Sequence, residues 1–186
     1  FSEGTFNAAF VPSYSSELVL GKKKSEKFAN KIFNLLLIGL LLIVLIIEIF
    51  MPSFIFIIAP GFSDNSDKLD LTISLTRITF PFLLFVSLSS FFSAVLNSHN
   101  KFAVASAAPI ILNIFLILTL IFQSYLKDDL VFYLSYAVTF AGIIQLIFLL
   151  FFIRKFYFPI IKFNFTIDDK VKLFFKKLLP SIFSSG

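Results

Sequence analysis

The stretch IFNLLLIGLLLIVLIIEIF, residues 32–50, holds only two polar side chains, Asn34 and Glu48. A hydrocarbon layer about 30 Å thick is crossed by about 20 mostly apolar residues in an α-helix. Inside lipid, every backbone N–H and C=O must find a partner within the segment, and the α-helix provides this for a single stretch of chain. The stretch therefore predicts a membrane-spanning helix.

Three further stretches meet the same test, at residues 71–96, 102–126 and 130–153. The first of them carries one charge, Arg77, near its start, and the other two carry none. Apolar residues make up 58% of the chain and charged residues 15%, whereas soluble domains have about a quarter charged. A chain of 186 residues cannot bury so much apolar surface in its own core. We therefore expect an all-α integral membrane protein with four complete transmembrane helices.

The connections between these spans alternate in charge. The segment before residue 32, the short turn between 96 and 102, and the segment after 153 together hold 13 of the 16 basic residues. The remaining two connections are acidic, with Asp64, Asp67 and Asp70 in one and Asp128 and Asp129 in the other. Basic connections face the cytoplasm in most membrane proteins, so the charge pattern predicts the orientation. The net charge of +5 follows from this bias and does not indicate a nucleic-acid partner.

The two ends of the chain predict partial helices. Residues 1–14 have the pattern of the end of a transmembrane helix, and residues 15–31 that of a cytoplasmic basic loop. The four spans within 32–153 form the central part of the chain. Residues 154–179 then form a basic cytoplasmic linker, and 180–186 begin another apolar run. We expect the chain to be a fragment with four complete helices and two partial ones.

An amphipathic helix is predicted inside the linker, at residues 166–179. Its apolar residues share one face: Ile167, Val171, Phe174, Phe175 and Leu178. Thr166 can cap the start of this helix through its hydroxyl. We expect it to lie on the cytoplasmic membrane surface, and a helix that docks on a partner protein is the alternative.

The composition excludes several chemistries. With no Cys there is no disulfide, thiolate metal site or Cys nucleophile, and the lone histidine, His99, argues against a His-based metal site. No P-loop, G-x-S-x-G or H-E-x-x-H pattern occurs in the sequence. We expect a protein without enzymatic activity, cofactor or metal.

Polar groups and prolines inside the spans are the functional candidates, because such residues are costly in lipid. Arg77 is a candidate for binding an anionic substrate; a side chain that reaches outward to the interface, or one in a structural ion pair, is the alternative. Glu48 is a proton or cation site, or a carboxylate solvated at the interface. Pro81 and Pro109 predict helix bends of the kind that frame the central cavity of transporters.

Four stretches of the sequence resemble the MurJ (MviN) family of lipid II flippases. The chain begins with FSEGTFNAAFVP at residues 1–12, which is similar to the family pattern F-x-E-G-A-F-x-x-A-F-V-P, with Thr5 where Ala is usual. APGFSD at residues 59–64 resembles the family loop A-P-G-F-x-D. LTRITFP at residues 75–81 matches the R-I-x-F-P start of a span, and APIILN at 108–113 the hairpin that follows. The four stretches occur in order across most of the chain.

The resemblance implies a two-lobe, 14-helix transporter of the multidrug/oligosaccharidyl-lipid/polysaccharide exporter superfamily. It implies transport of the undecaprenyl-pyrophosphate-linked oligosaccharide lipid II from the inner to the outer leaflet of the bacterial inner (cytoplasmic) membrane by alternating access. That activity serves peptidoglycan biosynthesis, cell wall biogenesis and cell shape. Another exporter of the superfamily, for drugs or O-antigen lipids, is the alternative, and a polyprenyl-phosphate membrane enzyme is a more distant one.

One family residue carries over directly, Glu3, in the first stretch. The resemblance implies that Glu3 belongs to the substrate cavity, where a carboxylate among arginines sets their spacing and can titrate during the cycle. A carboxylate exposed to the cytoplasm at a helix end is the alternative. Glu3 and Arg77 are therefore the predicted substrate-binding or cavity residues.

Overall fold

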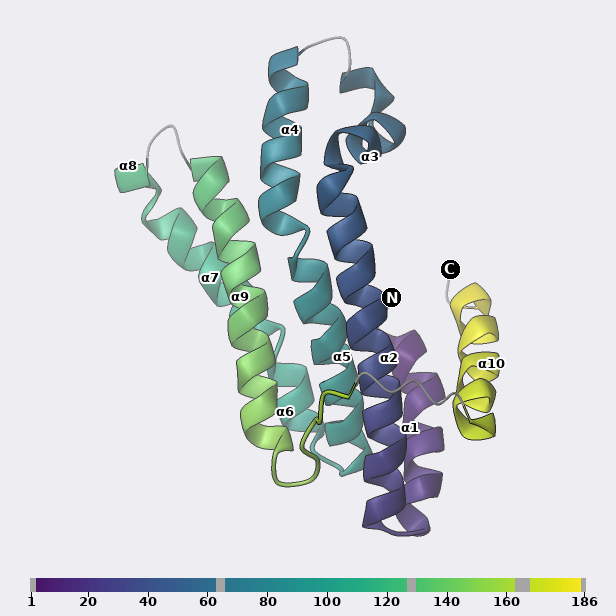
Figure 1. Cartoon of the computed structure of the whole chain (residues 1–186). Coiled ribbons are helices and arrows are strands. Elements are labelled where there is room, and N and C mark those ends of the chain that lie inside the picture. Colours follow the sequence, from purple (N-terminus) through teal and green to yellow (C-terminus); the bar gives the residue numbers. More distant parts are fainter. Residues whose placement is uncertain (1–2, 63–65, 127–129, 163–167, 185–186) are drawn as a thin grey trace.

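The computed structural model describes residues 3–62, 66–126, 130–162 and 168–184 of the chain. Within these residues all regular structure is helical (Figure 1). The elements are α1 (Glu3–Val19), α2 (Lys22–Ile49), α3 (Met51–Ile58), a 3-10 turn η1 (Pro60–Phe62), α4 (Ser66–Thr79), α5 (Phe82–Ser98), α6 (Phe102–Ala107), α7 (Ile110–Ile121), α8 (Gln123–Leu126), α9 (Leu130–Ile153) and α10 (Asp169–Ser184).

Four helical segments of the described chain are long and apolar enough to cross a membrane. They are α2, α4 with α5, α6 with α7, and α9, which has the predicted bounds of the fourth span. Large apolar side chains point outward along these segments, and Leu45, Ile117 and Phe140 are each 56% exposed. A monomer in water does not leave apolar surface of this extent uncovered, so lipid covers it. The predicted all-α membrane fold is confirmed.

The segment 15–31 is helical where a loop was predicted. Helix α1 continues to Val19 and α2 begins at Lys22, so only Leu20 and Gly21 separate the two helices. Gly21 has a φ of 121°, a conformation that other residues rarely adopt, and this allows the chain to reverse sharply. The lysines of this segment are good helix formers, so α2 extends out of the apolar region instead of ending there.

Two of the predicted spans are interrupted at proline. Helix α4 ends at Thr79 and α5 begins at Phe82, with Pro81 immediately before it. In the same way α6 ends at Ala107 and Pro109 directly precedes α7. Proline has no backbone N–H and its ring clashes with the preceding turn, so each span is made of two shorter helices. The bend is visible between α4 and α5 in Figure 1.

The amphipathic helix of the linker differs from its prediction in bounds and in place. Helix α10 begins at Asp169, and the side chain of Asp168 caps it by accepting a hydrogen bond from the Val171 N–H at 3.1 Å. Thr166, the predicted cap, lies outside the described residues. The helix continues past the predicted boundary at residue 180. Its apolar face does not lie free on a membrane surface, because Val171, Phe174 and Leu178 are buried against α1 and α2.

An aromatic core holds α10 in this position. Phe174 packs edge-on against Phe6 and Phe10 of α1, with ring centroids 5.9 Å and 6.1 Å apart. Phe10 also contacts Phe28 of α2 and Phe91 of α5. Each such pair contributes about 0.5–1.5 kcal/mol beyond the burial of its area. The core therefore fastens α1, α2, α5 and α10 into one unit.

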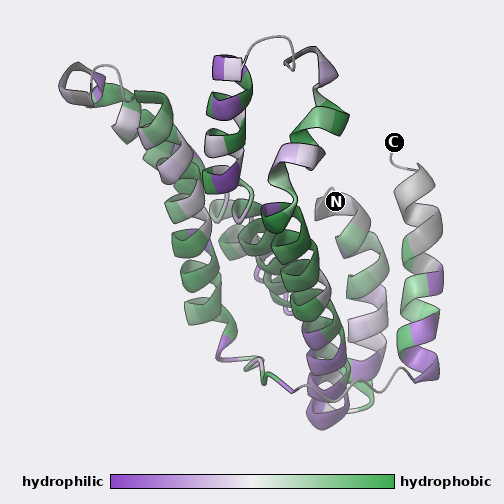
Figure 2. Ribbon diagram, turned by 45° about the horizontal axis from the view of Figure 1, so that its top comes forward, coloured by the Kyte–Doolittle hydropathy of each residue, from purple (hydrophilic) through white to green (hydrophobic). Residues whose placement is uncertain are grey.

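The charged residues gather at the two ends of the bundle. In Figure 1, the lower end of the bundle holds the α1–α2 turn, the α5–α6 turn and the residues that directly follow α9. The upper end holds the first residues of α4 and of α9. Figure 2 shows hydrophilic residues gathered at the lower end of α2 and α10 and again at the upper end of α4, with apolar ribbon between them. This arrangement agrees with the predicted four-span order, and the side of the membrane that each end faces stays a prediction.

Candidate functional site

Glu3, the residue carried over from the resemblance, is the first residue of α1. Its side chain lies outside the part that the structure describes. The backbone position can still be located, since α1 runs back from the Gly21 turn along α2, and Phe6 lines a small hollow with Leu36 and Leu40. Glu3 lies nearly one turn beyond Phe6, beside the middle of α2, where Figure 1 also has the start of α1. This depth is within the apolar part of the bundle.

Arg77 lies far from that position, in the last turn of α4, and its side chain is exposed. Its charge acts on the carboxylate of Glu48 in the last turn of α2, but within the described chain the two groups form no ion pair. One carboxylate oxygen of Glu48 is buried and has no hydrogen-bond partner among the described residues. The structure therefore brings Arg77 near Glu48 and does not bring it near Glu3.

Pro109 and the residue that follows Pro81 line one hollow. This hollow has a volume of about 330 Å³ and lies between α5, α7 and α9. Phe82 and Pro109 form part of its wall. Gln145 of α9, a buried residue, also lines the hollow. The two proline interruptions, which are distant in sequence, therefore meet at the same place in the bundle.

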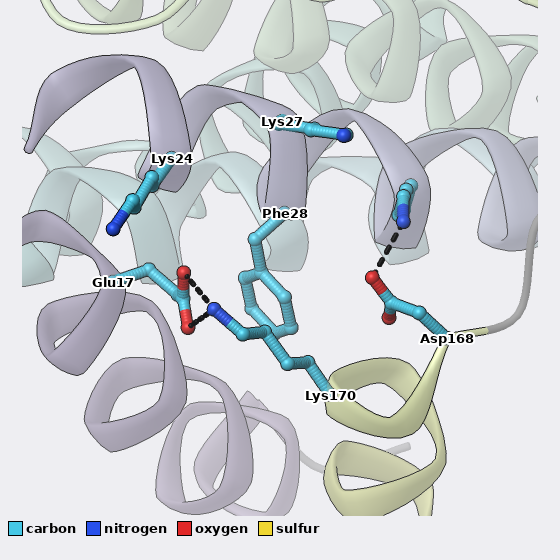
Figure 3. Close-up of a pocket in the computed structure, with 7 residues that line it drawn as sticks. Glu17, Lys24, Lys27, Phe28, Asp168 and Lys170 are labelled. Atoms are coloured by element: carbon cyan, nitrogen blue, oxygen red, sulfur yellow. Dashed lines mark hydrogen bonds and ion pairs between the residues drawn. The ribbon is translucent and has the colours of Figure 1, made fainter. Parts of the chain in front are cut away.

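Two ion pairs join the start of α10 to α1 and α2 (Figure 3). Lys170 Nζ lies 2.5 Å from the Glu17 carboxylate, and Lys31 Nζ lies 2.6 Å from that of Asp168. Glu17 is buried, with 7% of its surface exposed, so its partner is needed to compensate the lost hydration. Sequence reasoning overlooked Glu17, although it follows Phe6, Phe10 and Tyr14 on one face of α1. A carboxylate on an otherwise aromatic helix face indicates a buried group that needs a cationic partner, and this pattern could have identified Glu17 from the sequence.

The pKa of Asp168 is lowered from its ordinary value. Burial alone raises the pKa, but hydrogen bonds from Lys31 and from the Val171 N–H, together with the charges of Lys31 and Lys170, outweigh this rise. The folded state thus favours the carboxylate, and the resulting stability is present above the ordinary pKa of Asp. It is lost as the pH falls through the lowered pKa. Because the Asp168 side chain is 44% exposed, solvent screening limits the pair to under about 1 kcal/mol.

Two asparagines of α2 fix the chain that leaves α9. Asn34 donates to the carbonyl of Ile160 at 2.9 Å and accepts from the N–H of Lys162 at 2.7 Å. Asn30 accepts from the hydroxyl of Tyr157 and from the N–H of Ile160, both at 2.8 Å. Burial, followed by the charges of other groups, raises the pKa of Tyr157, so its hydroxyl stays protonated and donates. These bonds hold the chain from Tyr157 to Lys162 against α2.

His99 closes the same end of the bundle. Its Nε2 lies 3.2 Å from the hydroxyl of Tyr14, and its ring stacks on Phe156 with centroids 4.5 Å apart. Burial, and next the charge of Lys22, lower the pKa of His99, so the neutral imidazole is favoured. The three rings come from the end of α1, the α5–α6 turn and the chain after α9, and they tie these connections together.

The geometry described so far is that of a multi-pass membrane protein, and the described residues contain no group of three or more His, Cys, Asp or Glu side chains that could hold a metal ion. A family model described as lipid II flippase MurJ matches residues 1–186, the whole chain. The chain belongs to the MurJ family. The resemblance drawn from the four stretches of sequence is thereby confirmed.

Individual MurJ relatives agree with this assignment. A probable lipid II flippase MurJ of Rickettsia prowazekii (strain Madrid E) is 39% identical over 189 residues, which cover 100% of this chain and 36% of the relative. One of Rhizobium tropici is 40% identical over 151 residues, covering 78% of this chain and 28% of the relative. The lipid II flippase MurJ of Burkholderia cenocepacia is 30% identical over 146 residues, covering 77% and 28%. The chain spans about a third of the length of these relatives.

Proposed function

We propose that the protein containing this chain is a lipid II flippase of the bacterial inner membrane. It carries the lipid-linked peptidoglycan precursor from the inner to the outer leaflet by alternating access and performs no covalent chemistry on it. The observation that carries the proposal is the match of the MurJ family model along all of residues 1–186. Relatives that bear this name at 30–40% identity support it further, and they disfavour a drug exporter or a polyprenyl-phosphate enzyme.

Helices that bend are one means by which a transporter alternates access, beside rigid-body rocking of its lobes. The two spans interrupted at Pro81 and Pro109 have lost backbone hydrogen bonds at the interruption, and such sites are where transmembrane helices change direction. Both interruptions border the hollow between α5, α7 and α9. We expect these spans to change their angle at the prolines when the protein passes between its inward-open and outward-open states.

Glu3 is the residue of this chain to which we assign a role in the substrate path. The depth of the start of α1 beside the middle of α2 supports this role, since an ionisable group at that depth is costly unless it meets a partner or a water-filled cavity. A carboxylate there would hold cationic groups of the cavity apart and keep them available to a pyrophosphate. Arg77, exposed in the last turn of α4, is assigned a side chain that reaches outward to the membrane interface.

Replacing Glu3 tests this assignment in the full-length protein that contains the chain. We expect Glu3→Ala and Glu3→Gln to impair rescue of a strain depleted of its own lipid II flippase, because both variants remove the negative charge. A rise of about 1.4 kcal/mol or more in the transport barrier corresponds to about a tenfold or greater fall in rate. Rescue is measured as survival, and transport as exposure of the lipid-linked precursor in the outer leaflet.

Arg77→Ala is the matched control, because it also removes one charge from a membrane-spanning segment. We expect it to rescue the depleted strain, because an arginine side chain that reaches the interface keeps its charge in water and takes no part in the substrate path. Protein levels in the membrane must be equal for all variants. Full rescue by both Glu3 variants would remove the proposed role of Glu3. Failure of the unchanged full-length protein to rescue would contradict the proposed function itself.

A further inference from the structure

A polar pocket of about 180 Å³ lies between α1, α2 and the start of α10 (Figure 3). Four lysines and two carboxylates line it: Lys24, Lys27, Lys31, Lys170, Glu17 and Asp168. The pocket is distinct from the start of α1, where Glu3 lies, and from the hollow bordered by the prolines. Nothing in the proposed transport mechanism uses it.

The charges of this pocket do not balance. Lys31 pairs with Asp168 at 2.6 Å, and Lys170 pairs with Glu17 at 2.5 Å. Each carboxylate in the pocket is therefore already engaged by one ammonium group. Lys24 and Lys27 form no ion pair within the described chain, so the pocket keeps two positive charges without an opposite charge. Such an excess, enclosed on three sides by helices, attracts an anion with two or more acceptor oxygens.

Three of the pocket lysines lie along one face of α2. Lys24, Lys27 and Lys31 lie at positions i, i+3 and i+7 of α2, which places them along one face of the helix. Figure 3 shows Lys24 beside the Glu17–Lys170 pair and Lys27 farther along α2, toward Asp168. The ring of Phe28, which is 4% exposed, lines the pocket and lies between the two ion pairs in Figure 3. An anion bound here would be held between α2 and α10.

The pocket also lies at a defined depth. Its lysines on α2 come within about two turns of residue 32, where the apolar run of the span begins. This is the level of the lipid headgroups when the apolar run fills the hydrocarbon layer. Leu173 of α10 is 53% exposed beside the pocket-forming end of its helix, so apolar surface for an acyl chain lies close by. Basic pockets between helices at this level bind the phosphates of anionic lipids.

We propose that this pocket binds a phosphate group, with the headgroup of an anionic phospholipid as its source. The phosphate oxygens accept charge-assisted hydrogen bonds from Lys24 and Lys27, and the paired Lys31 and Lys170 complete the positive wall. The bound lipid links α2 to the start of α10 and thereby stabilises the docking of α10 on α1. This site is independent of the transported substrate, and the proposal goes beyond the proposed function.

The test uses the full-length protein, purified in detergent and titrated by calorimetry at constant ionic strength. The probes are a short-chain phosphatidylglycerol, the matching diacylglycerol without phosphate, and inorganic phosphate alone. We expect phosphatidylglycerol to bind and Lys24→Gln/Lys27→Gln to weaken that binding about tenfold, since each lysine near the surface contributes measurably to lipid binding. The control is Lys22→Gln/Lys23→Gln, which removes the same charge from the same helix but from outside the pocket.

The outcomes distinguish the possible sources of the bound phosphate group. Binding of phosphatidylglycerol but not of inorganic phosphate, lost only in the pocket variant, supports a phospholipid site. Equal binding of inorganic phosphate, with the same dependence on Lys24 and Lys27, supports the pocket and identifies free phosphate as its ligand. An equal loss in both double variants, or binding of diacylglycerol as strong as that of phosphatidylglycerol, overturns the proposal. Because no transport is measured, none of these results bears on the flippase function.

Discussion

Gly142 of α9 shows how closely two membrane-spanning helices approach in this protein. A Cβ atom built on Gly142 would lie 2.6 Å from Cδ2 of Phe82 and 3.1 Å from Cβ of Phe85, both on α5. Small residues at helix contacts in lipid let the backbones come together, and van der Waals packing then supplies much of the association energy. The absence of a side chain at Gly142 therefore lets α9 pack closely on α5.

Gly142→Ala is therefore expected to destabilise the protein. The ring of Phe82 could rotate away, but Cβ of Phe85 is fixed to the α5 backbone, so the two helices must separate by a few tenths of an ångström. Overpacking of this kind costs about 1–3 kcal/mol. The measurement is the Tm of the purified full-length protein in detergent, which should fall.

Gly39→Ala on α2 is the control for this prediction. No atom lies within 4 Å of a Cβ built on Gly39, so the substitution changes helix propensity without creating a clash. Its Tm should stay the same or rise slightly, because Ala favours the helix over Gly. Equal shifts in Tm for the two variants would show that the contact at Gly142 has no special importance.

Among the elements, α10 is held in place by contacts with helices that are distant in the sequence, α1 and α2. Its apolar face meets an aromatic face of α1, and its first turn is fixed by the pairs Glu17–Lys170 and Lys31–Asp168. An amphipathic helix lowers its free energy by burying its apolar side in either lipid or protein. Here the complementary surface of α1 is present, with an acidic group opposite Lys170, and the helix packs on it.

Cross-linking can test the docking of α10. In a background free of other cysteines, we expect Glu17→Cys and Lys170→Cys to be joined by a short bifunctional thiol reagent, because the two side chains meet in the structure. A protease site placed between α9 and α10 allows the cross-link to be read as two fragments that stay together on a denaturing gel.

The matched control pairs Glu17→Cys with Lys176→Cys, a position on the exposed side of α10. This pair should give little cross-linked product. Efficient cross-linking of Lys176, or none of Lys170, would indicate that α10 lies elsewhere, as a helix on the membrane surface would.

For the whole molecule, the separation of charge between the two ends predicts how the protein lies in the membrane. The three basic connections share one end, which also carries the lysine pocket. Asp67 and Asp70 of α4 belong to the opposite end. Basic segments are retained in the cytoplasm during insertion, so the end with the α1–α2 turn is predicted to be cytoplasmic.

Thiol labelling in intact cells checks this orientation. Single cysteines at Lys23, Ser66 and Lys101 can be treated with a membrane-impermeant reagent. We expect Ser66→Cys to react from outside, and Lys23→Cys and Lys101→Cys to react only after the cells are permeabilised. All three positions are exposed in the structure, so lack of reaction reflects the membrane barrier and not burial. Reaction of Lys23→Cys and Ser66→Cys from the same side would contradict the four-span arrangement.

The sequence by itself determined the number of spans, their helical structure and the alternation of charge between connections. These features follow from local quantities: the length of an apolar run against the thickness of a bilayer, and the count of lysines in each connection. Proline positions likewise predicted the interruptions at Pro81 and Pro109. The family could also be recognised from four short stretches in the expected order, because such motifs are defined by residue identity and do not depend on tertiary contacts.

Tertiary structure decided where the polar side chains of the basic end meet. Lys170 lies 153 residues from Glu17, and Lys31 lies 137 residues from Asp168. Nothing local to either partner identifies the other, because an amphipathic helix satisfies its apolar face equally well on lipid or on a neighbouring helix. The aromatic face of α1 provides the surface on which α10 packs in place of lipid. The lysine pocket and the fixed position of α10 exist because that face is large and apolar enough to displace lipid.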